Sequence, residues 1–220
     1  MATSQDKPLD FSEDGAVEQP TIKLFAEIGW QTMNCYHEFA SGKSNLGRES
    51  MLEVVLVERL KAALEKLNPH LSKEAINLAI EEIIRDRSMM NAVAANNQVY
   101  LMLKDGVKVS YRNENSQEEI IDIVQVIDWK NPANNDFLLT SQFWVAGEMY
   151  NRRADLIGFV NGLPLVFIEL KAAHKNVKNA YNDNLQDYRN NVPQLFIYNA
   201  IIILSNGIKR GAALLEQCLC

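Results

Sequence analysis

The sequence has little of what marks a secreted, membrane or disordered protein. Only three of its 220 residues are cysteines, and this odd number without metal-ligand spacing indicates reduced thiols. No apolar run approaches the ~20 residues that a membrane helix needs, so we expect no membrane partner. The polar start, MATSQDKPLDFSEDG, lacks the basic residues and apolar core of a signal peptide. We therefore expect a cytoplasmic protein.

Positive charge is also scarce. Lys and Arg total 22 against 28 Asp and Glu, so the formal net charge is −6 and the pI is about 5.2. Affinity for nucleic acid comes largely from Lys and Arg, which excludes strong non-specific DNA binding by bulk charge. If the protein acts on DNA, partners or a local basic face must hold the DNA. Hydrophobic residues make up 47% and charged residues 23%, which is typical of a globular domain.

The apolar pattern predicts helices in the front part of the chain. Helical spacing over 12–29, over 52–67 and from Ser72 onward predicts three helices, with Ser72 as the N-cap of the third. Pro20 predicts either a kink in the first helix or a helix start at that point. The polar residues 1–11 are expected to form a disordered tail.

Runs of β-branched and apolar residues dominate the second part of the chain. The expected strands are 99–103 and 107–111 as a hairpin, 120–127, 137–145, 156–160 and 165–170 as a second hairpin, and 195–204. The segment 173–191 contains no Gly or Pro and predicts a helix that ends before Pro193. Together these patterns predict one α/β domain with a helical N-terminal part.

Two apparent motifs carry no chemistry. Gly42-Lys43-Ser44 resembles the end of a phosphate-binding loop, but the glycine required five residues earlier is replaced by His37. We therefore expect a surface loop there. No histidine has a partner at i+3 or i+4 that would suggest a metal site; the three are His37, His70 and His174.

The second hairpin carries the residues with a chemical pattern. Asp155 stands at the start of one strand, and Glu169 and Lys171, which share a face, end the next. Hydrolysis of a phosphodiester needs a divalent metal, and Mg²⁺ prefers oxygen ligands. Asp155, Glu169 and the carbonyl of Leu170 would supply such ligands, and Lys171 would orient the attacking water. On spacing alone, a solvated strand end with a Glu–Lys pair is the more common interpretation.

The register of this hairpin decides whether the site exists. A two-residue turn at Asn161-Gly162 would place Asp155 opposite Ile168 and turn Glu169 to the other face. A three-residue loop over 161–163, or a bulge in either strand, would place Asp155 opposite Glu169. The site chemistry therefore predicts one of these two irregularities.

The hairpin stretch ADLIGFVNGLPLVFIELK resembles the nuclease segment of the R (restriction and motor) subunit of type I restriction enzymes. The resemblance covers roughly residues 12–208, in order. Its other segments are GAVEQPTIKLFAEIGW, LGRESMLEVVLVERLKAALEKLNP, NNQVYLMLKDGVKV and NNDFLLTSQFWVAGEMYNRRAD. It implies a PD-(D/E)xK fold, a mixed sheet with flanking helices, and a Mg²⁺-dependent cut in DNA. Carried over, Asp155 and Glu169 are metal ligands and Lys171 is the catalytic lysine.

The resemblance also implies accessory residues. Asn184 and Tyr188 occupy the positions of a family Gln-x-x-x-Tyr pair, but Asn is one methylene shorter than Gln, which puts its reach in doubt. The alternative role for Tyr188 is packing between helix and sheet. Glu18 matches an acidic residue near the metal, or is a solvated helix residue. Lys175 and Lys178 either contact phosphates or lie on a solvated helix face.

The end of the sequence departs from the family. We expect residues 209–220 to form an atypical tail and the ATP-driven motor that follows in the family to be absent, so ATP would act only through domains outside this sequence. The implied partners are DNA and the methylation and specificity subunits. Two functions stay open: a DNA endonuclease domain, favoured by the full Asp155, Glu169 and Lys171 set, or a non-catalytic remnant or assembly module, favoured by Asn184 and the missing motor.

The charge balance generates a prediction about DNA. The isolated chain should bind duplex DNA more weakly than the ~10⁻⁶ M end of ordinary non-specific binding, because its acidic excess opposes phosphate. Titration of a labelled duplex at physiological salt measures this affinity. Tighter binding would reveal a basic face that the composition hides.

Overall fold

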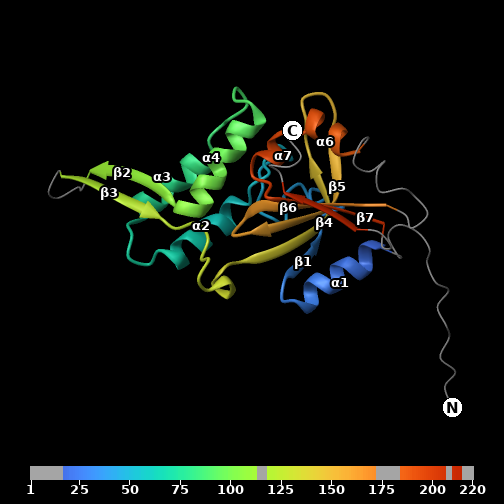
Figure 1. Cartoon of the computed structure of the whole chain (residues 1–220), viewed down its shortest axis with the longest axis horizontal. Helices are drawn as coiled ribbons and strands as arrows, with labels where there is room; N and C mark the ends of the chain where they lie inside the picture. Colours follow the sequence, from blue (N-terminus) through green and yellow to red (C-terminus); the bar gives the residue numbers. More distant parts are fainter. Residues whose placement is uncertain (1–16, 113–117, 172–183, 207–209, 215–220) are drawn as a thin grey trace, which may run out of the picture.

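The computed structural model describes residues 17–112, 118–171, 184–206 and 210–214, and its centre is a six-stranded mixed sheet (Figure 1). The strand order is β1-β4-β5-β6-β7-β8. The β1–β4 and β6–β7 pairs are parallel, and the other neighbours are antiparallel. The strands are β1 Gln31–Asn34, β4 Phe137–Val145, β5 Arg152–Val160, β6 Leu163–Leu170, β7 Ile201–Ser205 and β8 Arg210–Leu214. This confirms the predicted α/β class with a mixed sheet.

Helices cover both faces of this sheet. They are α1 Gln19–Glu27, α2 Val57–Leu67, α3 Lys73–Ile84, α4 Ala92–Asp105, α6 Gln186–Asn191 and α7 Gln194–Ile197, with a 3₁₀ turn η2 at Pro132–Asn134. On β6, Phe167 faces the larger core, which includes residues of α2, α3, α6 and α7. The adjacent Ile168 faces a smaller core, against which Ile22 and Phe25 of α1 pack. A strand buried on both faces reads as a continuous apolar run, as β6 does.

A separate antiparallel pair, β2 Val107–Arg112 and β3 Glu119–Val124, extends from the main body beside α3 and α4 (Figure 1). α3 packs against both strands. No helix in the described residues is both long enough and apolar enough to cross a bilayer.

Three predictions for the front helices have clear outcomes. Ser72 caps α3 as predicted, since its hydroxyl accepts from the Ala75 amide at 3.1 Å. Pro20 lies in the first turn of α1, where its missing N–H is tolerated, so the predicted helix start at that point is confirmed. The second helix begins at Val57, not at residue 52. The predicted disordered tail, 1–11, lies outside the described residues.

The prediction of a strand at 99–103 is wrong. These residues belong to α4, whose N-cap Asn91 accepts from the Ala94 amide at 2.8 Å. Val99 and Leu103 are four residues apart and share the buried face of the helix. Gly106, with φ +84°, ends the helix, and β2 then pairs with β3. A short apolar run fits either a buried helix face or a strand, and here the cap and the packing favour the helix.

The predicted strand over 195–204 is correct only in its second half. After Pro193 the chain forms α7, and the strand β7 begins at Ile201. No sequence pattern predicted β1, a short strand with mostly exposed side chains that pairs with β4. Of the predicted helix 173–191, the structure describes only residues 184–191, and α6 begins within them at Gln186.

The predicted irregularity in the β5–β6 hairpin is confirmed, and it is a bulge. Asn161 and Gly162 form a two-residue turn with φ of +51° and +79°, as a type I′ turn requires. Near the turn Phe159 pairs with Pro164, but beyond it Gly158 pairs with Val166. Leu165 is therefore the extra residue on β6. Further along, Leu156 pairs with Ile168, so the same register sets Asp155 opposite Glu169.

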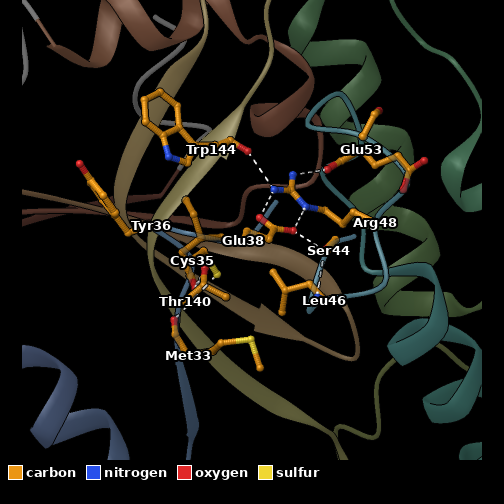
Figure 2. Close-up of polar contacts among 12 residues, drawn as sticks. Met33, Cys35, Tyr36, Glu38, Ser44, Leu46, Arg48, Glu53, Thr140 and Trp144 are labelled. Atoms are coloured by element: carbon orange, nitrogen blue, oxygen red, sulfur yellow. Dashed lines mark hydrogen bonds and ion pairs between the residues drawn. The ribbon is translucent and has the colours of Figure 1, made fainter. Parts of the chain in front are cut away.

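The segment between β1 and α2 is held by a buried ion pair (Figure 2). The Arg48 guanidinium bonds both carboxylate oxygens of Glu38 and also donates to the Glu53 carbonyl at 2.8 Å and the Trp144 carbonyl at 3.0 Å. The guanidinium stacks on the Phe143 ring at 4.0 Å. Ser44 donates to Glu38 as well, so the Gly42-Lys43-Ser44 segment folds onto an internal carboxylate, as expected for a loop without a phosphate site.

The hairpin turn generates a prediction about stability. A methyl group at Gly162 would lie 2.5 Å from the Leu56 carbonyl oxygen and 2.7 Å from the Leu60 nitrogen, so backbone must move. Gly162→Ala should lower the free energy of unfolding by about 2 to 4 kcal/mol. The matched control is Gly42→Ala, which has φ +80° and open space around the new methyl group and should cost only about 1 to 2 kcal/mol. Urea unfolding measures both, and equal losses would contradict the close approach.

Candidate active site

The structure brings the three predicted catalytic residues together at the ends of β5 and β6. The Leu170 amide donates to Asp155 Oδ2 at 2.8 Å, which fixes the carboxylate of β5 against β6. Lys171 Nζ donates to Glu169 Oε1 at 2.9 Å. The bulge described above makes this meeting possible. A strand-end Glu–Lys pair is present as well, but Glu169 is buried rather than solvated.

Glu169 is only 2% exposed, and its two oxygens have different surroundings. Oε1 accepts from Lys171 and, at 2.6 Å, from the Asn184 amide. Oε2 is buried and has no hydrogen-bond partner among the described residues. Burial of a charged oxygen without a partner costs on the order of several kcal/mol of folding free energy, so this oxygen needs a cation or an ordered water.

This donor set fits Mg²⁺. Two carboxylates, Asp155 and Glu169, lie beside one another, and one of them offers an unpartnered oxygen. The described residues contain no cluster of three or more His, Cys, Asp or Glu side chains that would form an all-protein metal cage. Mg²⁺ usually takes one or two carboxylates and keeps several waters. The carbonyl of Leu170 as a third ligand stays a prediction.

A fourth polar side chain, Gln142 of β4, belongs to this region. Ser141 pairs with Leu156 and Phe143 pairs with Ala154, so the register sets Gln142 across from Asp155. Its φ is +57°, in the left-handed region that a non-glycine residue adopts only at some cost. Its amide donates to Glu18 Oε2 at 2.7 Å. Sequence reasoning missed Gln142, and the available signal was a lone amide within the apolar strand FLLTSQFWV.

Glu18 lies at the N-terminus of α1 and is 5% exposed, so the alternative of a solvated helix residue is wrong. Its contact with Gln142 connects α1 to the strand beside Asp155. The geometry therefore keeps Glu18 near the site, and its role toward a metal stays a prediction.

The doubt about the reach of Asn184 is resolved, because its amide bonds Glu169 directly. Tyr188 has a packing role: its ring contacts Phe167 at 5.1 Å and its hydroxyl donates to the Arg153 carbonyl at 2.6 Å. Burial, and then the nearby Glu169 and Asp155 charges, raise the pKa of Tyr188, so the hydroxyl stays protonated. Lys175 and Lys178 lie outside the described residues.

Among the described residues, the cysteine and the histidines play no part in the site. Cys35 is buried, and burial raises the pKa of its thiol to about 12, so it is not a nucleophile at neutral pH. His37 and His70 are exposed surface residues, as predicted. His174 lies outside the described residues.

The fold and this site define a class: an α/β domain with a mixed sheet that carries paired carboxylates and a lysine at adjacent strand ends. The sequence model of the family described as "Type I restriction enzyme R protein N terminus" matches residues 10–210. The chain belongs to this family.

Several curated proteins are similar to the chain. The type I restriction enzyme HindI endonuclease subunit of Haemophilus influenzae is 32% identical over 202 residues, which is 87% of this chain and 18% of that protein. A Methanocaldococcus jannaschii protein, provisionally named a type I restriction enzyme endonuclease subunit, is 29% identical over 90% of this chain and 19% of its own length. The EcoprrI endonuclease subunit of Escherichia coli is 36% identical over 87 residues, 38% of this chain and 28% of that protein. The chain thus spans about a fifth of the length of the first two relatives.

The unpartnered Glu169 oxygen generates a prediction about metal. Mg²⁺ or Mn²⁺ at about tenfold its Kd should add about 1.4 kcal/mol and raise the melting temperature by about 3 to 6 °C. Glu169→Ala should remove most of this rise. Glu65→Ala, at an exposed position of α2, is the matched control and should keep it. An unchanged metal response in Glu169→Ala, read by calorimetry, would refute the metal assignment.

Proposed function

We propose that this chain is the Mg²⁺-dependent endonuclease domain of a type I restriction–modification system, and that its fold is of the PD-(D/E)xK type. The observation that carries the proposal is Glu169: a buried carboxylate with one oxygen unpartnered among the described residues, beside Asp155 and bonded to Lys171. A packing role does not account for a buried charge left half-satisfied. The names of the relatives, all of them endonuclease subunits, support the same conclusion.

Each residue then has a defined task. Asp155 and Glu169, with the Leu170 carbonyl, would hold the ion, which offsets charge on the phosphate and lowers the pKa of bound water. Lys171 is 17% exposed at its side chain and is fixed on Glu169, so it is placed to orient the attacking water and stabilise its hydroxide form. Water attacks phosphorus, the P–O bond to the leaving oxygen breaks, and that oxygen takes up a proton. Asn184 keeps Glu169 oriented through its 2.6 Å bond.

The proposed partners follow from the same function. DNA is the substrate, and the methylation and specificity subunits are partners of the whole R protein. ATP would act only through motor domains of such a longer protein. The second candidate, a non-catalytic assembly module, loses part of its support, because the Asn184 side chain reaches Glu169 in spite of its length.

Plasmid nicking tests the proposal. With Mg²⁺ or Mn²⁺ the chain should convert supercoiled DNA to open circles, and Asp155→Asn, Glu169→Gln and Lys171→Ala should each reduce the rate about 100-fold or more. Glu65→Ala should leave the rate unchanged. Thermal melting of each variant separates lost chemistry from lost folding.

Nicking that survives Glu169→Gln would show a contaminating nuclease or another site. A folded wild-type chain that binds metal and cuts no DNA would favour the assembly module.

A further inference from the structure

Arg153 lies on β5 two residues before Asp155 and is exposed. Its guanidinium lies between two aromatic rings, 5.1 Å from the centre of Tyr36 and 5.4 Å from Trp144. Trp144 is its cross-strand partner on β4, and Tyr36, 49% exposed, follows β1. Figure 2 shows both rings on the side of the strands away from the buried Arg48–Glu38 pair.

The charge of Arg153 is not neutralised within the described residues. Five other arginines there have carboxylate partners: Arg48 with Glu38, Arg59 with Asp136, Arg85 and Arg87 with Glu82, and Arg152 with Asp187. The Arg153 guanidinium has no ion pair to a described residue, only the two rings. The chain has a net charge of −6, yet it exposes this cation close to the candidate site, where it can attract an anion.

The rings restrict the side chain without using its donors. A guanidinium stacked on aromatic rings is held by its planar faces, while its five N–H donors point outward along its edge. The edge is the part that binds phosphate in a bidentate manner. Because stacking already limits the rotamers, less side-chain entropy is lost when an anion binds.

The position of Arg153 relates it to the cutting site. Arg153 and Asp155 are two residues apart on β5, about 6.6 Å along the strand. The alternation of faces breaks at Asp155, since Ala154 faces the larger core and Leu156 faces the smaller core. Adjacent nucleotides of one DNA strand rise about 3.4 Å. A phosphodiester held at Asp155 therefore has neighbours of the same strand within reach of the Arg153 side chain.

We propose that Arg153, held between Tyr36 and Trp144, binds a backbone phosphate that flanks the scissile phosphate and so positions DNA in the site. This inference rests on the proposed nuclease function and names a DNA contact of that site. The contact is to the backbone, so it carries no sequence preference of its own.

The test uses the whole chain with a short labelled duplex, without divalent metal, between about 50 and 200 mM salt. Arg153→Gln should weaken binding about 3- to 10-fold and reduce the slope of log K against log salt by about 0.9, the value for one phosphate contact. Arg153→Lys keeps the charge and should keep the slope, but it loses planar stacking and should bind less tightly than wild type. Arg112→Gln, the same charge change at the exposed end of β2, should alter neither quantity.

Cleavage gives a second readout. Arg153→Gln should raise the KM for DNA by a similar factor and leave kcat within about twofold, because a flanking contact acts in binding. The inference is overturned if Arg153→Gln matches the wild type in affinity and salt slope, or if the wild type does not bind duplex at the lowest salt.

The outcomes also separate this inference from the function on which it rests. Binding that depends on Arg153, without any cleavage in Mg²⁺ or Mn²⁺, would refute the nuclease and leave the DNA contact. Cleavage that depends on Glu169 but is indifferent to Arg153 would leave the nuclease and refute the contact.

Discussion

The candidate site depends on one extra residue in β6. The tight turn at Asn161-Gly162 sets a register that, if continued, would place Asp155 opposite Ile168. Leu165 shifts the strand by one position, so the polar ends of β5 and β6 meet. Phe167 and Ile168 lie in opposite cores, because adjacent residues of a strand face opposite sides. Both faces of β6 are apolar, so either register buries apolar side chains. The apolar packing therefore tolerates the shift, and the polar residues benefit from it.

Two buried glutamates show how structure distinguishes support from function. Glu38 is bonded by Arg48 through both oxygens and by Ser44, and these contacts hold the segment after β1 against β4. Glu169 has donors on one oxygen only within the described part of the chain. A buried charge with complete partners stabilises a local structure, whereas an incomplete set leaves room for a ligand.

Irregular backbone surrounds the site on both sides. Gln142 adopts a left-handed conformation in the middle of β4, and the β5–β6 ladder contains the bulge. Such a conformation costs on the order of 1 kcal/mol and persists only where the surroundings enforce it. Here the contact of Gln142 with the buried Glu18 is part of that enforcement. Asp155 thus lies between two strands that both depart from regular pairing.

The sequence by itself determined the α/β class, the cap at Ser72 and strand β4, because these depend on local pattern and spacing. The sequence also placed Asp155, Glu169 and Lys171 at strand ends, but their proposed roles came from the family resemblance. It also required an irregular hairpin, but it left open whether a loop or a bulge supplied the shift. Only the tertiary structure decided that 99–103 is helical and that β7 begins at Ile201, because short apolar runs fit either structure until they are packed. The contacts of Asn184 with Glu169, Gln142 with Glu18, and Arg153 with two rings join segments distant in the chain. No local pattern specifies such contacts, since they follow from strand order and register.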